Sequence, residues 1–108
     1  MSETSDAIVV YVTTPAPEVA RQIAGELLDK KLIACANLIS PVQSLYSWQG
    51  AVQNESETLM IIKTRRSQFD ALCRAVQALH PYQVPEIIAI PIILGSTSYL
   101  DWIQDVTS

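Results

Sequence analysis

The sequence predicts one α+β domain whose elements follow the order β-α-β-β-α-β, with an additional helix at the C-terminus. Its 108 residues fit a single domain and leave no room for a second. The hydrophobic share, 49%, is enough to form a core without disulfides or a structural metal. Extended apolar runs and segments of helical periodicity follow one another along the chain in that order. We expect residues 1–6 to form a disordered lead and residues 7–108 to form the domain.

The first strand and the first helix are predicted from residues 7–31. Residues 7–12 are apolar and mostly β-branched, which is typical of a strand buried on both faces. Pro15 and Pro17 end this run, and prolines are favoured at the opening of a helix. From residue 18 to residue 31 apolar side chains recur every four positions and so share one face of a helix. These side chains are Val19, Ala20, Ile23, Ala24, Leu27 and Leu28.

A long hairpin is predicted next. Residues 32–48 form an extended stretch that Pro41 interrupts, and because proline lacks an N–H for the ladder we expect an edge position or a bulge there. Gln49 and Gly50 are predicted to form the turn, and residues 52–64 run back. Both arms exceed the usual strand length of about 5–6 residues.

Two features predict a homo-oligomer. A small domain cannot easily cover so long a hairpin, and its free edge can pair with another chain. The charged fraction is 17%, against a usual value of about 25%. This leaves uncharged surface that a partner subunit would cover.

A second helix is predicted after the hairpin. Ser67 with Asp70 three residues later is a variant of the capping box, and Pro81 ends the helix. The predicted apolar face contains Phe69, Leu72, Cys73, Val76 and Leu79.

The remaining chain predicts one strand and a final helix. Residues 84–94 form another apolar extended run, and Ser98 with Asp101 three residues later could cap a short helix. The resulting order is that of the ferredoxin-like split βαβ arrangement, in which helices cover one face of an antiparallel sheet.

The charge and the lengths of the apolar runs argue against nucleic-acid and membrane partners. The net charge is −4 and no run of lysines and arginines exceeds two residues, so there is no basic patch for a phosphate backbone. No apolar run reaches the roughly 18 residues that a membrane span needs. Glu3 and Asp6 stand where a secretion signal would carry basic residues, and two cysteines then indicate free thiols in a reducing compartment. We expect a cytoplasmic protein.

Specific segments of the sequence point to a family. Four of them occur in order, and two aromatic residues follow. They are Ala-Cys-Ala-Asn-Leu-Ile at 34–39, Tyr-Ser-Trp-Gln-Gly at 46–50, Ile-Lys-Thr at 62–64, His-Pro-Tyr-Gln-Val-Pro-Glu-Ile at 80–87, Tyr99 and Trp102. Together they resemble the CutA family, the divalent-cation tolerance proteins, over roughly residues 7–106.

This resemblance implies a cytoplasmic homotrimer of ferredoxin-like subunits whose long hairpins complete one another's sheets. It also implies tolerance of copper and other divalent metals, with copper or another divalent cation as a bound ion and no obligatory cofactor. Some bacterial members carry cysteines at the positions of Val12 and Ala75, whereas this chain has Cys73 two positions before Ala75. Only Cys35 matches, so we do not expect a copper site of three cysteines within one subunit.

Cys35, His80 and Glu86 are the candidate metal ligands. Cys35 lies between two alanines, and is either a small buried sheet residue or a soft ligand for Cu(I) or zinc. His80 either caps the last turn of the second helix or serves as a ligand or proton relay. With one histidine and two cysteines, a closed zinc site within one subunit would need carboxylates. Linear or trigonal Cu(I) needs fewer ligands, and copies of one ligand could converge on a threefold axis.

The remaining candidates form a predicted cleft or subunit interface. Lys63 lies in an apolar strand, so we expect a carboxylate partner and choose Glu86. We hypothesise that one cleft, within a subunit or between two subunits, is lined by Cys35, Lys63, His80, Tyr82 and Glu86. Trp48 at the hairpin tip, and Tyr99 and Trp102 on one face of the last helix, are the aromatic candidates for packing.

Three functions compete at this point. The first is a trimeric metal-tolerance protein, and the second is a trimeric small-ligand sensor or adaptor with clefts between subunits, by analogy of fold alone. With only three glycines there is no phosphate-binding loop for a nucleotide. The third is an enzyme with Cys35 as nucleophile and His80 as base, which we rank last, so we expect no enzymatic activity.

Overall fold

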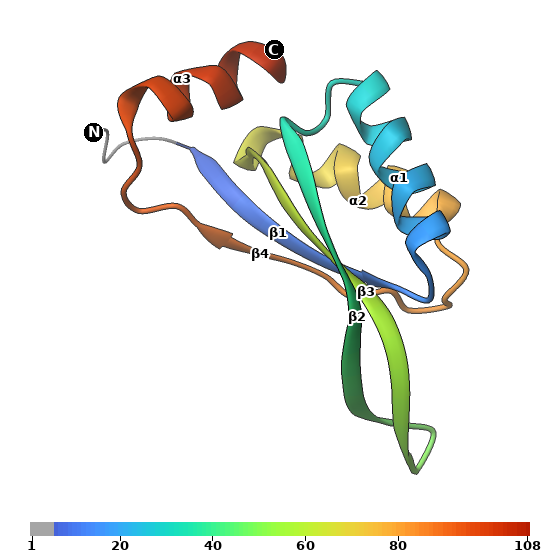
Figure 1. The fold of residues 1–108 in the computed structure, drawn as a ribbon. Coiled ribbons are helices and arrows are strands. Elements are labelled where there is room, and N and C mark those ends of the chain that lie inside the picture. The colour runs from blue at the N-terminus through green and yellow to red at the C-terminus, as the bar shows by residue number, and fades with distance from the viewer. Residues whose placement is uncertain (1–5) are drawn as a thin grey trace.

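A computed structural model describes residues 6–108 of the chain. Residues 1–5, most of the expected disordered lead, lie outside the described residues. The backbone carbonyl of Asp6 accepts a hydrogen bond from the N–H of Arg66 at 2.8 Å. The elements occur in the predicted order (Figure 1). They are β1 (Ala7–Thr14), α1 (Pro17–Asp29), β2 (Cys35–Trp48), β3 (Ala51–Arg65), the 3₁₀ turn η1 (Arg66–Gln68), α2 (Phe69–Leu79), β4 (Ile87–Pro91) and α3 (Thr97–Val106).

The four described strands form one antiparallel sheet in the order β2-β3-β1-β4. Helices α1 and α2 cover one face of this sheet (Figure 1). The main core lies between these two helices and the sheet. It includes the fully buried residues Val10, Val12, Ile23, Leu27, Met60, Ile62, Leu72 and Val76. The α+β class and the packing of these helices on one face are as the sequence predicts.

The opposite face of the sheet is open. Within one subunit β1 is therefore not buried on both faces as predicted, because Val9 and Tyr11 point away from the helices and are only half-buried. On the neighbouring strand Ile90 pairs with Val9 and Ile88 pairs with Tyr11, so these isoleucines share that face. Ile88 and Ile90 are 54% and 48% exposed. A continuous apolar surface thus lacks cover within one subunit.

Helix α3 packs at one end of the sheet, where β1 begins. Leu100 and Ile103 form a second, smaller buried cluster there with Ala7 and Ala34. Arg65 fixes the end of the helix: its Nε donates to the Thr107 hydroxyl at 2.9 Å and its Nη2 to the Thr107 carbonyl at 2.8 Å. Within residues 6–108 no helix is long and apolar enough to cross a membrane.

The β2–β3 hairpin extends beyond the helices, in a molecule whose longest dimension is 44 Å (Figure 1). Its turn is formed by Gln49 and Gly50, with φ of 51° and 82°. The predicted irregularity at Pro41 is confirmed, because the pairing with β3 shifts between Ile39 and Val42 and the Ser40–Pro41 peptide bond is cis.

The predicted start of the second helix is wrong. Residues 66–68 form a tight 3₁₀ turn directly after β3, so Ser67 lies inside that turn, and α2 begins only at Phe69. The residue before the helix, Gln68, makes no side-chain capping hydrogen bond. Asp70 still places a negative charge in the first turn.

The cap of the last helix is two residues earlier than predicted. Ser96, not Ser98, is the N-cap, and its hydroxyl accepts a hydrogen bond from the N–H of Tyr99 at 3.4 Å. The last strand is also shorter than the predicted run 84–94. Pro85 lacks the N–H that would extend the ladder, and the chain before Ile87 forms a loop instead.

Candidate functional site

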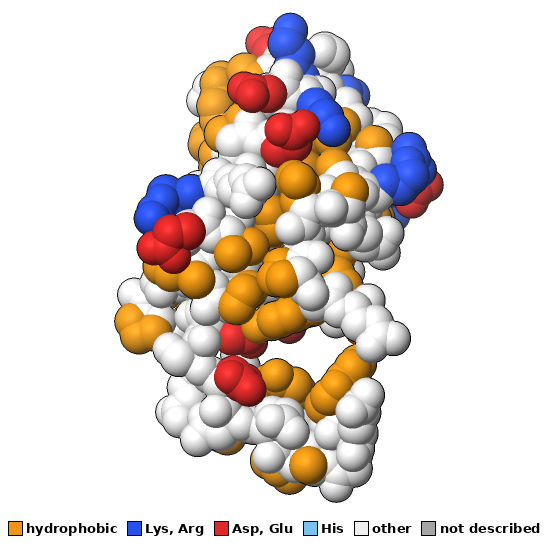
Figure 2. All heavy atoms as spheres, turned by 90° about the vertical axis from the view of Figure 1, so that its right-hand side faces the viewer, with side chains coloured by type: hydrophobic (Ala, Val, Ile, Leu, Met, Phe, Trp, Pro, Cys, Tyr) orange, Lys and Arg blue, Asp and Glu red, His pale blue; other side chains and the backbone are white. Residues whose placement is uncertain are grey.

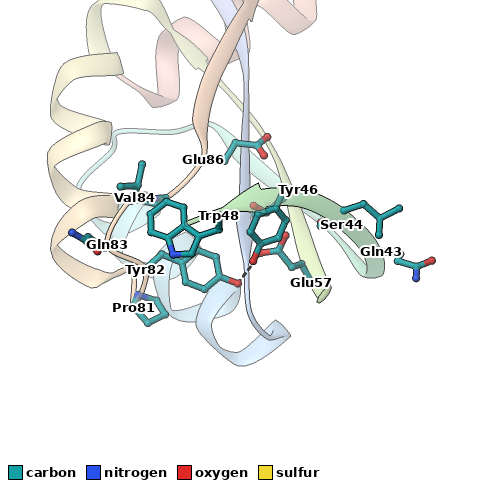
Figure 3. Close-up of a pocket in the computed structure, with 13 residues that line it drawn as sticks. Gln43, Ser44, Tyr46, Trp48, Glu57, Pro81, Tyr82, Gln83, Val84 and Glu86 are labelled. Carbon is teal, nitrogen blue, oxygen red and sulfur yellow. Dashed lines mark hydrogen bonds between the residues drawn. The ribbon is translucent and has the colours of Figure 1, made fainter. Parts of the chain in front are cut away.

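An open cleft of about 850 Å³ lies between the hairpin and the loop that follows α2 (Figures 2 and 3). Its lining residues are Thr13, Gln43, Ser44, Leu45, Tyr46, Trp48, Glu57, Pro81, Tyr82, Gln83, Val84, Pro85 and Glu86. Glu57 and Glu86 are the only charged residues among them. In Figure 2 the hollow beside the hairpin has hydrophobic and acidic side chains at its edge, and no lysine or arginine.

His80 holds the cleft loop against β1. The residue is 7% exposed. Its ring places Nε2 at 2.7 Å from the Thr13 carbonyl oxygen, while Nδ1 accepts a hydrogen bond from the N–H of Tyr82 at 3.1 Å. These partners assign the proton to Nε2 and the lone pair to Nδ1. Both nitrogens are therefore engaged. The side chain caps no helix carbonyl, and it is the His80 backbone N–H that bonds to Val76 at the end of α2.

Tyr82 joins the loop to the hairpin. Its hydroxyl donates a hydrogen bond to Glu57 Oε2 at 2.7 Å (Figure 3). Burial, and then this bond to a carboxylate, raise the pKa of Tyr82 far above its usual value. The phenol therefore stays protonated and keeps donating at any physiological pH.

Glu57 is a buried carboxylate with an incomplete set of partners. It is 5% exposed, and within residues 6–108 it has no ion pair with a lysine or arginine. Its other oxygen, Oε1, has no hydrogen-bond donor within the described structure. In the same residues, every side-chain oxygen or nitrogen that is completely buried does have a hydrogen-bond partner, so Oε1 is not completely buried. Oε1 therefore keeps some contact with solvent, and Glu57 is one of the residues that line the cleft.

Two aromatic side chains of β2 form the hairpin side of the cleft. Tyr46 and Trp48 are 39% and 41% exposed and lie two residues apart, so they project from the same face of the strand. The pKa of Tyr46 is raised, first by local desolvation and then by the negative charges of Glu55 and Glu57. Two carboxylates thus lie close enough to act on the Tyr46 hydroxyl.

Cys35 lies in a different place, at the α3 end of the sheet. Its Sγ is 3.7 Å from the hydroxyl of Tyr99, whose ring centroid is 5.4 Å from that of Trp102. Desolvation and the contact with Cys35 raise the pKa of Tyr99. Cys35 is half-buried, so its thiol is neither enclosed in the core nor fully exposed.

Within one subunit, the predicted Lys63–Glu86 ion pair does not form in the described residues. Lys63 pairs with Cys35 across the hairpin and its Nζ donates to Asn37 Oδ1. Glu86 lies just before β4 and lines the cleft. The physical reason is position along the sheet: Lys63 is opposite Val9, about four residues or 13 Å from the end of β1 that Glu86 adjoins.

The predicted single cleft is thus divided within one subunit. Tyr82, Glu86 and Trp48 line the cleft and His80 supports it, whereas Cys35 and Lys63 lie with Tyr99 and Trp102 at the other end of β1 and β3. Across residues 6–108, no three His, Cys, Asp or Glu side chains gather closely enough to hold a metal ion. Within one subunit Cys35 and His80 are also too far apart for a nucleophile–base pair. His80 bonds to Thr13, whereas Cys35 is aligned with Lys63 and Val9, four residues away along β1.

Sequence reasoning missed Glu57 and Tyr46 as members of the site. Glu57 belongs to a strand whose residues 51–56 are exposed or half-buried, and its burial comes from a loop 25 residues later. No local pattern in the sequence signals such cover. Cys73, predicted in the core, is half-buried, and partial burial raises the pKa of its thiol.

Comparison with known proteins identifies relatives over nearly the whole chain. The model of the CutA1 divalent ion tolerance protein family matches residues 8–106. The chloroplastic protein CutA 1 of Oryza sativa subsp. japonica is 47% identical over 98% of this chain, which spans 60% of that relative's length. The divalent-cation tolerance protein CutA of Thermus thermophilus is 46% identical, over 92% of this chain and 96% of its own.

Solved structures agree with this relationship. The CutA1 crystal structure from Oryza sativa superimposes with a TM-score of 0.93 at 47% identity, covering 99% of this chain and 98% of that one. The periplasmic divalent cation tolerance protein CutA from Archaeoglobus fulgidus superimposes with a TM-score of 0.92 at 40% identity, over 94% and 99%.

Proposed function

Because this chain belongs to the CutA1 divalent ion tolerance family, we propose that it acts as a homotrimer that binds copper or another divalent cation weakly. The family description names an effect on ions rather than a reaction, and we assign no catalytic step. The observation that carries the metal proposal is the half-buried Cys35 thiol, a soft donor next to the open sheet face rather than inside the core.

The open sheet face supports the trimer. Ile39, Ile88 and Ile90 are about half exposed there, although burying such side chains stabilises a protein by roughly 1.5–3 kcal/mol each. Strands β2 and β4 are the two edges of the sheet, so each has one side free to pair. We infer that subunits with the ferredoxin-like plan cover this face and that the long hairpins extend one another's sheets.

Trimerisation would also supply the missing metal ligands. One subunit does not fit a metal ion, because the described residues hold no group of three candidate ligands and both His80 nitrogens are engaged. Copies of Cys35 around a threefold axis would give a trigonal thiolate set that suits Cu(I). Glu86, on the exposed loop, could contribute a carboxylate only if another subunit brought it near.

The experiment that tests the metal proposal is a competition titration of the reduced protein with Cu(I) and a colorimetric Cu(I) chelator. We expect Cys35→Ser to abolish uptake and Cys73→Ser, the matched control, to leave it unchanged. Equal uptake by Cys35→Ser and the unsubstituted chain would refute the assignment of Cys35.

A second candidate function is a small-ligand sensor or adaptor. The specific observation in its favour is the cleft, whose volume lies within the range of about 300–1,000 Å³ that is usual for ligand pockets. For either function we propose a cytoplasmic location, because the free thiols Cys35 and Cys73 suit a reducing compartment. Relatives differ in this respect, since the names of two plant proteins say chloroplastic and that of the Archaeoglobus protein says periplasmic.

A further inference from the structure

We propose that the cation for the buried Glu57 carboxylate comes from a second copy of this chain, and that Lys63 of the partner subunit supplies it. This inference rests on the proposed homotrimer and adds to it an ion pair between two named side chains. The cleft beside the hairpin is then a composite site, because a residue of the adjacent subunit completes it.

Glu57 carries a charge that one subunit leaves unbalanced. The residue is 5% exposed, and its described hydrogen-bond partner is the neutral hydroxyl of Tyr82. Within residues 6–108 it makes no ion pair with a lysine or arginine. A neighbouring subunit that covers the open sheet face would remove this carboxylate further from water. A buried charge is costly unless an opposite charge accompanies it.

Lys63 is the complementary charge on the same face of the sheet. It is half-buried and lies in one row with Val9 and Cys35 on the neighbouring strands. Its Nζ donates to the neutral amide oxygen of Asn37, and no carboxylate in the described part of the chain pairs with it. Cover by another subunit would therefore bury this ammonium group without an opposite charge as well.

Glu57 and Lys63 project from the same face of β3 but cannot meet within one subunit. They lie six residues apart, or about 20 Å at ~3.3 Å per residue, whereas an ion pair needs a separation within about 4 Å. The last paired residues of β1 and β3 are Thr14 and Thr58, so Glu57 stands where the hairpin leaves its own sheet. Lys63 stands near the other end, beside α3.

This placement suits a head-to-tail contact in a closed ring. In the proposed trimer each hairpin extends the sheet of a neighbour, so it carries its carboxylates beyond its own subunit and onto the next one. Opposite charges at the two ends of one face then attract across every interface of the ring. The same contact repeats three times in a trimer and balances all three Glu57 carboxylates.

No other cation of the chain is as well placed for this contact. The chain has seven lysines and arginines, all within the described residues. The guanidinium of Arg65, on the open face, is bonded to Thr107. The other five belong to α1, α2 or the turns beside them and so lie on the helix side of the sheet: Arg21, Lys30, Lys31, Arg66 and Arg74. Lys63 remains.

A double-mutant cycle on trimer dissociation tests the ion pair. The variants are Glu57→Gln, Lys63→Gln and the two together. Sedimentation-velocity ultracentrifugation measures the trimer–monomer equilibrium of each full chain, at one urea concentration where the unsubstituted protein shows both species. We expect each single variant to raise the protein concentration needed for half-assembly at least about tenfold, and the double variant to raise it no further. Since the two positions are about 20 Å apart within a subunit, such coupling reports a contact between subunits.

Two exposed carboxylates near Glu57 provide the controls, Glu55 on β3 and Glu86 in the loop. The effects of Glu55→Gln and Glu86→Gln should simply add to that of Lys63→Gln. If Glu57→Gln and Lys63→Gln are additive in a chain that still trimerises, the ion pair is wrong and the homotrimer stands. Coupling of Lys63 to Glu55 or Glu86 instead would also overturn the assignment. A monomeric unsubstituted chain would overturn both the ion pair and the homotrimer.

Cross-linking decides the question if Glu57→Gln does not fold. A carbodiimide activates a carboxylate, which then forms an amide bond with a lysine amine in direct contact. We expect the unsubstituted trimer to yield covalent dimers in which mass spectrometry finds Glu57 joined to Lys63. Lys63→Arg keeps the positive charge but has no primary amine, so it should trimerise without this product. A trimer that yields no Glu57–Lys63 product would, in that case, overturn the proposal.

Discussion

The hydroxyl of Tyr82 donates a hydrogen bond to the buried carboxylate of Glu57, across 2.7 Å and 25 residues of sequence. This contact connects the loop after α2 to the middle of β3 and thereby closes one side of the cleft. The loop has a second attachment at His80, whose ring bonds both to β1 and to the N–H of Tyr82. Two hydrogen-bonded groups thus position the loop.

Tyr82→Phe is expected to destabilise the fold by about 1–3 kcal/mol, because it leaves a buried carboxylate without its donor. Urea unfolding measures the difference. Tyr46→Phe is the matched control: it removes the same hydroxyl from the same cleft, where that group has no hydrogen bond in the described structure, and should cost less than about 0.5 kcal/mol. Equal losses in the two variants would contradict the role of the Glu57–Tyr82 bond.

The raised pKa of Tyr82 also predicts a pH dependence. An unfolded tyrosine ionises near pH 10, whereas the folded state holds the Tyr82 proton to higher pH. The stabilisation from this group is therefore complete below about pH 10 and is lost as the pH rises above it. In an ultraviolet titration of tyrosinate, the step that Tyr82→Phe removes should be the one at the highest pH; removal of an earlier step would refute this.

His80→Ala is expected to lower stability by about 2–3 kcal/mol through loss of its two hydrogen bonds and its buried ring. Copper uptake by the folded variant should not change, because neither ring nitrogen is free. Denaturant unfolding and the chelator competition measure the two effects. A stable variant that no longer takes up copper would show instead that His80 is a metal ligand.

Ile90→Lys is expected to convert the assembly into monomers, because it places a charge on the open face of the sheet. Light scattering during size-exclusion chromatography measures the mass. Leu28→Lys on α1 is the control, since Leu28 is 46% exposed, close to the 48% of Ile90, but lies on a helix away from that face. If both variants keep the same mass as the unsubstituted chain, the open face is not the interface.

Much of the fold follows from local patterns in the sequence. The order of the elements, the hairpin turn at Gln49–Gly50 and the irregularity at Pro41 depend on periodicity and on the backbone limits of glycine and proline. The starts of the helices are harder to predict, because they depend on the turns that precede them. Ser67 fails as a cap because a 3₁₀ turn precedes α2, and Ser96 replaces Ser98 because the last helix begins one residue after Ser96.

The candidate site was only partly predictable. The segment 80–87 directed attention to Tyr82 and Glu86, which line the cleft, and to His80, which holds its loop. The sequence could not show that Cys35 and Lys63 lie at the opposite end of the same strands. Glu57 escaped attention because a distant loop buries it. Burial by a segment that is distant in the sequence produces no recognisable pattern in the spacing of residues.

The measurement that tests the central claim most directly is native mass spectrometry of the reduced protein, with and without Cu(I), Cu(II) and Zn(II). We predict a trimer that gains copper, either one ion on the threefold axis or one at each interface, and that loses this gain in Cys35→Ser. A monomeric mass would contradict the proposed assembly, and a trimer that stays free of every metal would contradict the proposed binding.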